Sequence, residues 1–231
     1  MSDAIRASLQ GVGTSLRIEL DDNWTITPSV QYQDQESVGS WGDDLSNFAA
    51  GQYAVKHFRE EYSRDKWYQA GLTIEGQVGT FDVTYAGNYL NRDVDASFDY
   101  SDYSYWYDNL YTSGYFAGLF LNNAGGRPNP AHSFINNDGY TKTSHELRLS
   151  SDSTKRLRGL IGFFYQKQKH DFEQPFGNIV GLADAMLLNR DEPNGRKYPG
   201  VVYLNSFDRI DTDKAVFGQL AYDITDNLEL T

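Results

Sequence analysis

Hydrophobic and polar residues alternate along most of the chain with a period of two, and clusters of Asp, Asn and Gly end the alternating runs. This period is typical of β-strands whose two faces meet different surroundings, because successive side chains of a strand point to opposite sides. Helical periodicity is scarce. The alternation predicts strands over residues 15–20, 24–32, 68–75, 81–89, 145–149, 157–170 and 208–224.

The two faces of these strands differ in polarity. In residues 24–32 one face carries Trp, Ile, Pro, Val and Tyr, while the other carries Thr, Ser and Gln. A soluble β-sandwich needs apolar side chains on its inner face. The polar face of this sheet must therefore look into water or against a plug.

The connections between the expected strands alternate between short and long. Short turns fall near 21–23, 78–80, 150–156 and 225–227, whereas long segments cover roughly 36–62, 98–139 and 173–207. Aromatic residues stand near both kinds of strand end, as expected for two aromatic girdles. These features predict an all-β, antiparallel up-and-down transmembrane β-barrel segment of about eight strands with long extracellular loops.

Five segments of the alternating pattern carry a resemblance to a known family; they are Leu16–Val30, Trp67–Gln69, Asp82–Asn91, Ser144–Leu149 and Ala215–Ile224. Their most specific parts are the Ser-His-Glu-Leu-Arg-Leu strand and the Ala-Val-Phe-Gly strand that leads into a Tyr-Asp-Ile-Thr-Asp turn. Together these segments resemble the barrel of TonB-dependent receptors, the energy-coupled importers of the outer membrane of Gram-negative bacteria.

The resemblance implies a larger barrel, of about 22 strands, filled by an N-terminal plug. It implies uptake of a scarce nutrient such as a ferric siderophore, cobalamin or a glycan, driven by the TonB energy-transducing complex acting through the plug. We therefore expect residues 1–231 to be a partial β-barrel domain, with the plug, the TonB box and the remaining strands outside this segment. Expected partners are outer-membrane lipid, the TonB complex and an unidentified small-molecule or glycan ligand.

The amino-acid composition excludes several classes of function. A net charge of −12 and a pI near 4.6 argue against nucleic acid as a partner. The absence of Cys removes disulfides, thiolate metal sites and Cys nucleophiles. No common catalytic or nucleotide-binding motif occurs in the sequence, so we expect neither an enzyme nor a cofactor.

Two groups of residues that contain histidine are candidate metal sites. His145 and Glu146 are adjacent in a strand and should face opposite ways. His170, Asp171 and Glu173 stand where a strand becomes a long loop, and solvated charge at the rim explains them better than a cation site. We expect no metal.

The most informative predicted loop is the aromatic, acidic stretch 98–111. Aromatic faces stack on rings and cations, and carboxylates accept hydrogen bonds from hydroxyls. The alternative interpretation is a girdle that continues into the rim, with alternation at Tyr103, Tyr105 and Tyr107. The candidate ligand-binding residues are Tyr100, Asp102, Tyr103, Tyr105, Trp106, Tyr107 and Asp108.

Two other functions stay open at this point. A passive porin-type barrel would need no plug, and a secreted, soluble carbohydrate-binding module would use the aromatic loop as its platform. The apolar run 179–188 could form a short helix over the barrel mouth or contact a membrane surface. Expressed alone, the chain should form an unclosed sheet with two unpaired edges and collect in inclusion bodies.

Overall fold

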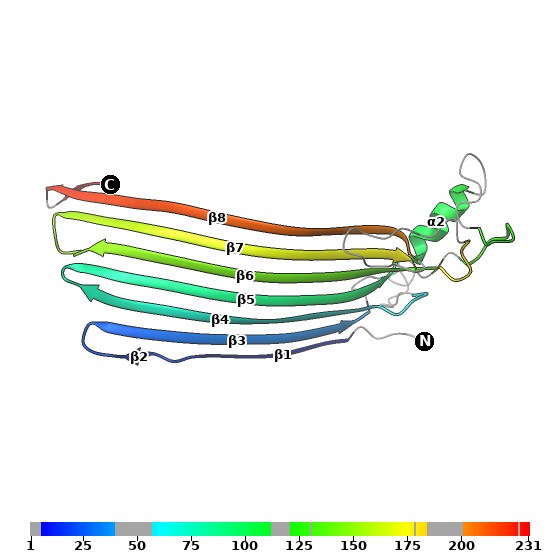
Figure 1. The fold of residues 1–231 in the computed structure, drawn as a ribbon, viewed down its shortest axis with the longest axis horizontal. Helices are drawn as coiled ribbons and strands as arrows, with labels where there is room; N and C mark the ends of the chain where they lie inside the picture. The colour runs from blue at the N-terminus through cyan, green and yellow to red at the C-terminus, as the bar shows by residue number, and fades with distance from the viewer. Residues whose placement is uncertain are drawn as a thin grey trace.

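The computed structural model describes residues 6–39, 57–111, 121–129, 131–177, 179–183, 201–225 and 227–231, with residues 107–111 described by their backbone only. These residues form one long, nine-stranded antiparallel sheet and one α-helix (Figure 1). The elements are β1 Arg6–Ser15, β2 Ile18–Glu19, β3 Trp24–Val38, β4 Tyr62–Val78, β5 Phe81–Asp99, α2 Ser101–Tyr111, β6 Ser133–Ser151, β7 Leu157–Gly177, β8 Val201–Thr225 and β9 Leu228–Leu230.

Each long strand pairs with the next one along the chain, which confirms the predicted up-and-down order. The described strands do not close into a ring, since β1 and β9 stand at opposite edges of the sheet. Among the described residues, no helix combines the length and the apolar character that crossing a membrane requires.

The short turns are built by local hydrogen bonds and one glycine. Asp21 accepts hydrogen bonds from the backbone N–H groups of Asn23 (2.8 Å) and Trp24 (2.9 Å), which fixes the entry into β3. Val78 pairs directly with Phe81, so a two-residue turn joins β4 to β5, and Gly79 supplies the positive φ of 64° that this tight reversal uses.

The strands extend further toward the long connections than the alternation predicts. β6 begins at Ser133 instead of residue 145, and β8 begins at Val201 instead of residue 208. β1 covers Arg6–Ser15, ahead of the predicted start at residue 15, and its first residue pairs with Val38 on the same side of the sheet. The predicted strands end where one face of the strand ceases to be apolar, although the hydrogen-bonded pairing with the neighbouring strands continues beyond that point.

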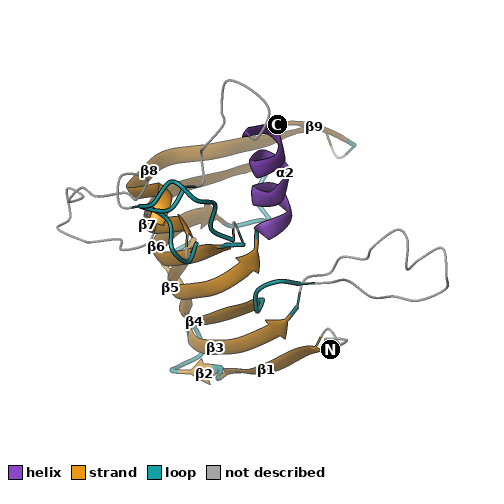
Figure 2. Ribbon diagram, turned by 90° about the vertical axis from the view of Figure 1, so that its right-hand side faces the viewer, coloured by secondary structure: helices purple, strands orange, loops and turns teal. Residues whose placement is uncertain are grey.

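The sheet is curved, and α2 lies on its concave side (Figure 2). Tyr100, directly before α2, contacts the rings of Phe134 and Phe176. Side chains that share a face with these two rings therefore point to the concave side, and their neighbours along each strand point to the convex side.

Strand register gathers the apolar residues of the convex face into continuous rows near the short turns. One row, made of directly paired residues, crosses seven strands. It consists of Ile18, Ile26, Ile74, Tyr85, Leu147, Phe163 and Val216. We call this turn-side half of the convex face the apolar band; many of its side chains are exposed, including Val216 at 70% and Leu220 at 71%.

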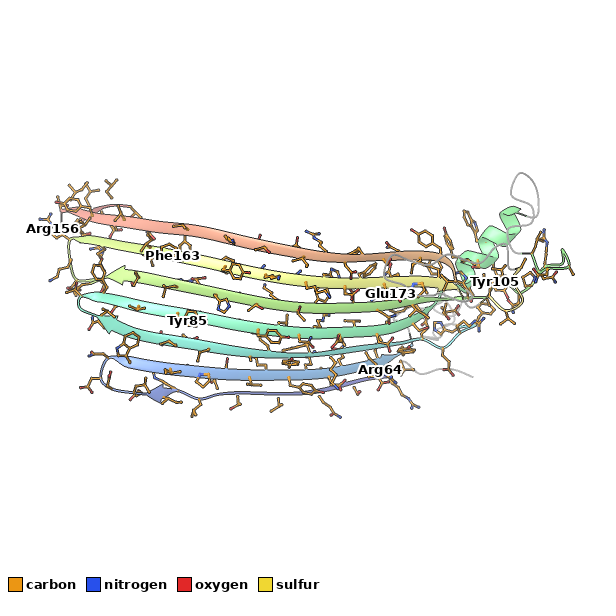
Figure 3. All side chains as sticks on the ribbon, in the orientation of Figure 1. Arg64, Tyr85, Tyr105, Arg156, Phe163 and Glu173 are labelled. Carbon is orange, nitrogen blue, oxygen red and sulfur yellow. The ribbon has the colours of Figure 1, made fainter. Side chains whose placement is uncertain are left out.

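The other half of the convex face is polar and charged. In Figure 3, Tyr85 and Phe163 of the apolar band lie in the half of the sheet near the short turns, whereas Arg64 and Glu173 lie in the half near α2. One row in this second half consists of Glu36, Arg64, Asp95, Asn137, Glu173 and Ser206. A single face thus changes from apolar to charged along the strands.

Candidate functional site

The predicted aromatic loop is largely a helix, which corrects the loop and the alternating-rim interpretations of residues 98–111. Asp99 stabilises the first turn of α2, because the Asp99 carboxylate accepts hydrogen bonds from the backbone N–H (2.9 Å) and the hydroxyl of Ser101. The other carboxylate oxygen accepts from the backbone N–H groups of Phe58 and Arg59, the latter at 3.1 Å. Asp99 therefore ties α2 to the segment that leads into β4.

Burial alone would raise the pKa of Asp99, but the hydrogen bonds from Ser101, Phe58 and Arg59 outweigh it and hold the pKa below its usual value. Buried contacts add to this anchor. Ser104 hydrogen-bonds to Nδ1 of His132, and both side chains are almost fully buried.

Acidification should loosen this anchor. Because the folded-state pKa of Asp99 is lowered, its stabilising contribution is complete above the unfolded pKa of about 3.9 and is lost as the pH falls through the folded value. We expect the amide protons of Phe58 and Arg59 to be protected equally at pH 7 and pH 5 and to lose protection below about pH 4. Hydrogen exchange, corrected for intrinsic rates, measures this.

The matched variants for this test are Asp99→Asn and Asp102→Asn. The first should lower protection at every pH and remove its acid dependence, because a neutral amide oxygen is a weaker acceptor. The second changes an exposed carboxylate of the same helix and should change little. Equal effects of the two variants would contradict the anchor.

The predicted ligand-binding residues separate into two groups. Tyr100 and Tyr103 come together, with ring centroids 4.8 Å apart, and Asp102, Tyr103 and Trp106 are exposed on α2. Tyr105 instead packs on Phe58 at 5.3 Å and donates to Oδ1 of Asn129 at 2.8 Å, so its role is to support the helix. The side chains of Tyr107 and Asp108 lie outside the described residues.

A row of rings crosses the concave face beneath Tyr100. Adjacent ring centroids lie 5.6, 4.9 and 5.4 Å apart, and Tyr100 contacts the two middle rings. The members of this aromatic row are Phe98, Phe134, Phe176 and Tyr203. It forms because register places these four residues opposite one another on β5 to β8.

A chain of amides lies directly beside the aromatic row. Asn205 donates to Gln174 (3.3 Å), Gln174 donates to Asn136 (2.8 Å), and Asn136 donates to Asp138 (3.3 Å). The other carboxylate oxygen of Asp138 contacts Nε2 of His170. These donations run in one direction toward Asp138, which fixes the orientation of every amide in the chain.

A second aromatic group follows nearer the middle of the strands. The His170 ring stacks on Tyr140 at 4.0 Å and meets Phe207 edge-on at 4.8 Å, and Phe207 stacks on Phe172 at 4.8 Å. Arg92 lies 5.9 Å from the Tyr140 ring centre. Together with the aromatic row and the amide chain, this group makes the concave face near α2 a surface of rings and hydrogen-bonding groups.

Sequence reasoning missed most of this surface. Residues 201–207 were assigned to a long loop, and 133–139 likewise, so their alternation was not considered. The signal that could have found them is the period-two spacing of Tyr203, Asn205 and Phe207, together with Phe134, Asn136 and Asp138 on the partner side. Both runs begin a strand directly after a long connection.

The two histidine groups differ in how they match the prediction: His145 and Glu146 face opposite ways as predicted, whereas His170 is not a solvated rim charge, because its ring is mostly buried and stacks on Tyr140. His170 and its neighbours do not converge, since His170 points to the concave face and Asp171 and Glu173 to the convex face. His145 contacts the Tyr85 hydroxyl at 2.7 Å, whereas Glu146 contacts Arg148 on the other face. In the part of the chain that the structure describes, no group of three potential ligands could hold a metal ion.

The predicted helix over residues 179–188 is described only for 179–183, which form a turn; residues 184–188 lie outside the described residues. Ile179 and Leu182 are buried, and the Ala183 N–H donates to the Leu121 carbonyl at 2.6 Å. This part of the long connection therefore packs against the segment that follows α2.

No protein-family model matches the chain, and no curated protein matches its sequence. The function must therefore be inferred from the two faces of the sheet.

Proposed function

We propose that this chain forms part of the wall of an outer-membrane β-barrel that works as an energy-coupled importer of the TonB-dependent type. Its convex face contacts lipid, and its concave face lines the lumen. The observation that carries the proposal is the apolar band, which gathers exposed apolar side chains on one half of one face.

The dimensions of the band suit a bilayer. On β5 it runs from Phe81 to Tyr89, close to the roughly 9–11 residues that a tilted membrane-spanning strand needs. Beyond Tyr89 the convex face becomes charged, as at Asp95 and Glu173. An Arg or Lys side chain at the bilayer midplane costs about 2–4 kcal/mol, and an Asp or Glu side chain costs less but is still unfavourable, so such residues belong outside the hydrocarbon.

The strands are longer than the membrane is thick, and their excess length lies on the side of the long connections. β8 covers Val201–Thr225, but its unbroken run of apolar convex residues begins only at Val216, because the earlier Leu204 and Ile210 alternate with polar or charged residues. Long connections and projecting strands mark the outer side of an outer-membrane barrel, and short turns mark the periplasmic side. The surface of rings and amides thus faces the cell exterior and the lumen.

A lipid-facing sheet cannot leave backbone groups unpaired, because the hydrocarbon offers no hydrogen bonds. In this proposal the edges at β1 and β9 pair with further strands of the same barrel. The resemblance to TonB-dependent receptors supplies the remaining elements, namely a plug, the TonB complex and a scarce nutrient as cargo. The segments that carry the resemblance lie largely within β3, β4, β5, β6 and β8.

The two rival functions make different demands. A soluble carbohydrate-binding module would leave the apolar band in water, which is unfavourable for so large a surface. A passive porin shares the membrane wall and differs in needing no energy. Uptake that stops when the TonB complex is deleted separates the importer from the porin.

Spin labels at single cysteines test the membrane wall. The sequence has no Cys, so Val216→Cys and Ala215→Cys can be introduced into the native gene and labelled in isolated outer membranes. Val216 lies in the apolar band and Ala215 on the concave face. We expect the label at 216 to collide mainly with dissolved oxygen, which concentrates in lipid, and the label at 215 with a water-soluble nickel complex.

Leu72 and Thr73 on β4 provide a second pair, and Ser206→Cys a control on the charged half of the convex face. The control should be accessible to nickel although it shares a face with residue 216. Absence of the protein from the outer membrane, or nickel access at every position, would overturn the proposal.

Growth tests address the importer. A strain that lacks the gene should grow more slowly than its parent when iron chelates, cobalamin or a glycan is the limiting nutrient. The same defect should follow deletion of the TonB complex. A defect that is independent of that complex would instead favour the porin.

A further inference from the structure

The outer half of β8 presents a ring, an amide and a second ring in succession to the concave side. These are Tyr203, Asn205 and Phe207, and residues two apart on a strand share a face at a spacing of about 7 Å. The side chains of Tyr203 and Phe207 are 59% and 42% exposed, and Asn205 is exposed as well. The strand therefore offers two aromatic surfaces with a hydrogen-bonding group between them.

Each of the three side chains is held from β7. Tyr203 meets Phe176 edge-on at 5.4 Å, and Asn205 donates to Gln174 at 3.3 Å. Phe207 stacks on Phe172 at 4.8 Å, with their planes 21° apart. Side chains fixed in this way lose little conformational entropy when a ligand binds, so the surface is pre-organised.

The charged groups on the concave side include two arginines paired with carboxylates and Asp138, the carboxylate that ends the amide chain. Arg92 forms two hydrogen bonds to the Asp65 carboxylate, at 2.8 and 2.6 Å, and Arg209 pairs with Asp211 at 2.9 Å. An anionic ligand would have to displace these carboxylates to reach the guanidinium groups. The surface thus suits a neutral ligand that has both flat apolar faces and hydroxyl groups.

We infer that this surface binds a neutral oligosaccharide, an inference that rests on the proposed importer and names its cargo class. Sugar rings stack their C–H faces on Tyr203 and Phe207, and Asn205 exchanges hydrogen bonds with the hydroxyls between them. Asn205 is held in place because its side-chain amide donates a hydrogen bond to Gln174, the next member of the amide chain. Tyr103 and Trp106, exposed on α2, extend the aromatic surface for longer chains.

Calorimetric titration of the protein, purified in detergent from the native gene, tests the inference. The probes are maltohexaose, cellohexaose and laminarihexaose, with a ferric catecholate complex as the charged comparator. We expect one neutral hexasaccharide to bind and Tyr203→Ala to weaken it about tenfold, the effect of losing one ring contact of about 1.4 kcal/mol. Asn205→Leu should have a similar effect.

The control variant is Tyr222→Ala. Tyr222 is an exposed tyrosine of the same strand, but it lies on the convex face, so its removal should leave glycan binding unchanged. Spin-label accessibility at residues 215 and 216 checks that each variant keeps its fold.

The outcomes separate this inference from the proposed function. If no hexasaccharide binds, or if Tyr203→Ala binds as the parent does, the oligosaccharide inference fails while the membrane wall can still pass its accessibility test. Binding of the ferric complex alone would also overturn it. Glycan binding by a protein that fails the accessibility test would instead favour the soluble module over the importer.

Discussion

On the proposed lipid-facing wall, replacing Leu220 by lysine should nearly abolish accumulation of the folded protein in the outer membrane. Leu220 lies midway along the apolar part of β8, between Val216 and Ile224, and its side chain is 71% exposed on the convex face. A lysine at the bilayer midplane costs about 2–4 kcal/mol. The equilibrium between membrane-inserted and unfolded protein should therefore shift by at least about thirtyfold.

The matched control is Gln219→Lys, one residue away on the same strand. Gln219 pairs with Leu160 and points to the concave face, where the proposed lumen provides water for the new charge. Its effect should stay within about 0.5 kcal/mol, as for an ordinary surface substitution. Quantitative blotting of outer-membrane fractions, with heat-dependent gel mobility as the fold assay, measures both variants, and equal losses would argue against a lipid-facing convex side.

The difference between these neighbouring positions was predictable from sequence alone. Around Leu220 the two faces differ in polarity, so alternation identifies the strand and its two sides together. The short turns were predictable for a similar reason, because Asp21 and Gly79 belong to residue types that stabilise tight reversals. Strand order followed from the short connections, since a two-residue turn leaves antiparallel pairing as the simplest arrangement.

The outer halves of β6 and β8 were not predictable in this way. Between Ser133 and Tyr140 both faces carry polar residues, and around Tyr203 apolar residues occur on both faces. Neither run has the contrast between an apolar and a polar face that identified the other strands, so its period-two spacing of rings and amides was not recognised. Their strand conformation follows from pairing with β5 and β7, which residue patterns within one strand do not report.

The helix α2 was missed because its sequence is unfavourable for a helix. Ser, Tyr and Asp dominate residues 101–111, and all three have modest helix propensity. Tertiary contacts override this weakness, since Asp99 satisfies the first turn and Ser104 packs against His132. The candidate site was consequently predicted in part, with Tyr100 and Tyr103 included and the aromatic row on β6, β7 and β8 left out.

The packing of Trp24 on Gly76 gives the second large expected effect. The two residues face each other on β3 and β4, and the indole ring covers the glycine so closely that an added Cβ would lie 2.2 Å from Cε3 of Trp24. Gly76→Ala should therefore displace the whole ring and destabilise the protein by about 1–3 kcal/mol, the usual cost of overpacking. Denaturant unfolding of the purified protein in micelles, followed by far-ultraviolet circular dichroism, gives the free energy.

A double-mutant cycle isolates the contact. Once Trp24→Ala has removed the ring, Gly76→Ala should be neutral or stabilising by up to about 1 kcal/mol, because alanine loses less backbone entropy than glycine on folding. Gly139→Ala is the control, since its added Cβ would meet Asp171 at an ordinary 3.8 Å. If Gly76→Ala lowers the free energy of unfolding equally with and without the indole ring, the strain arises elsewhere, and contact with Trp24 is not the reason that position 76 requires glycine.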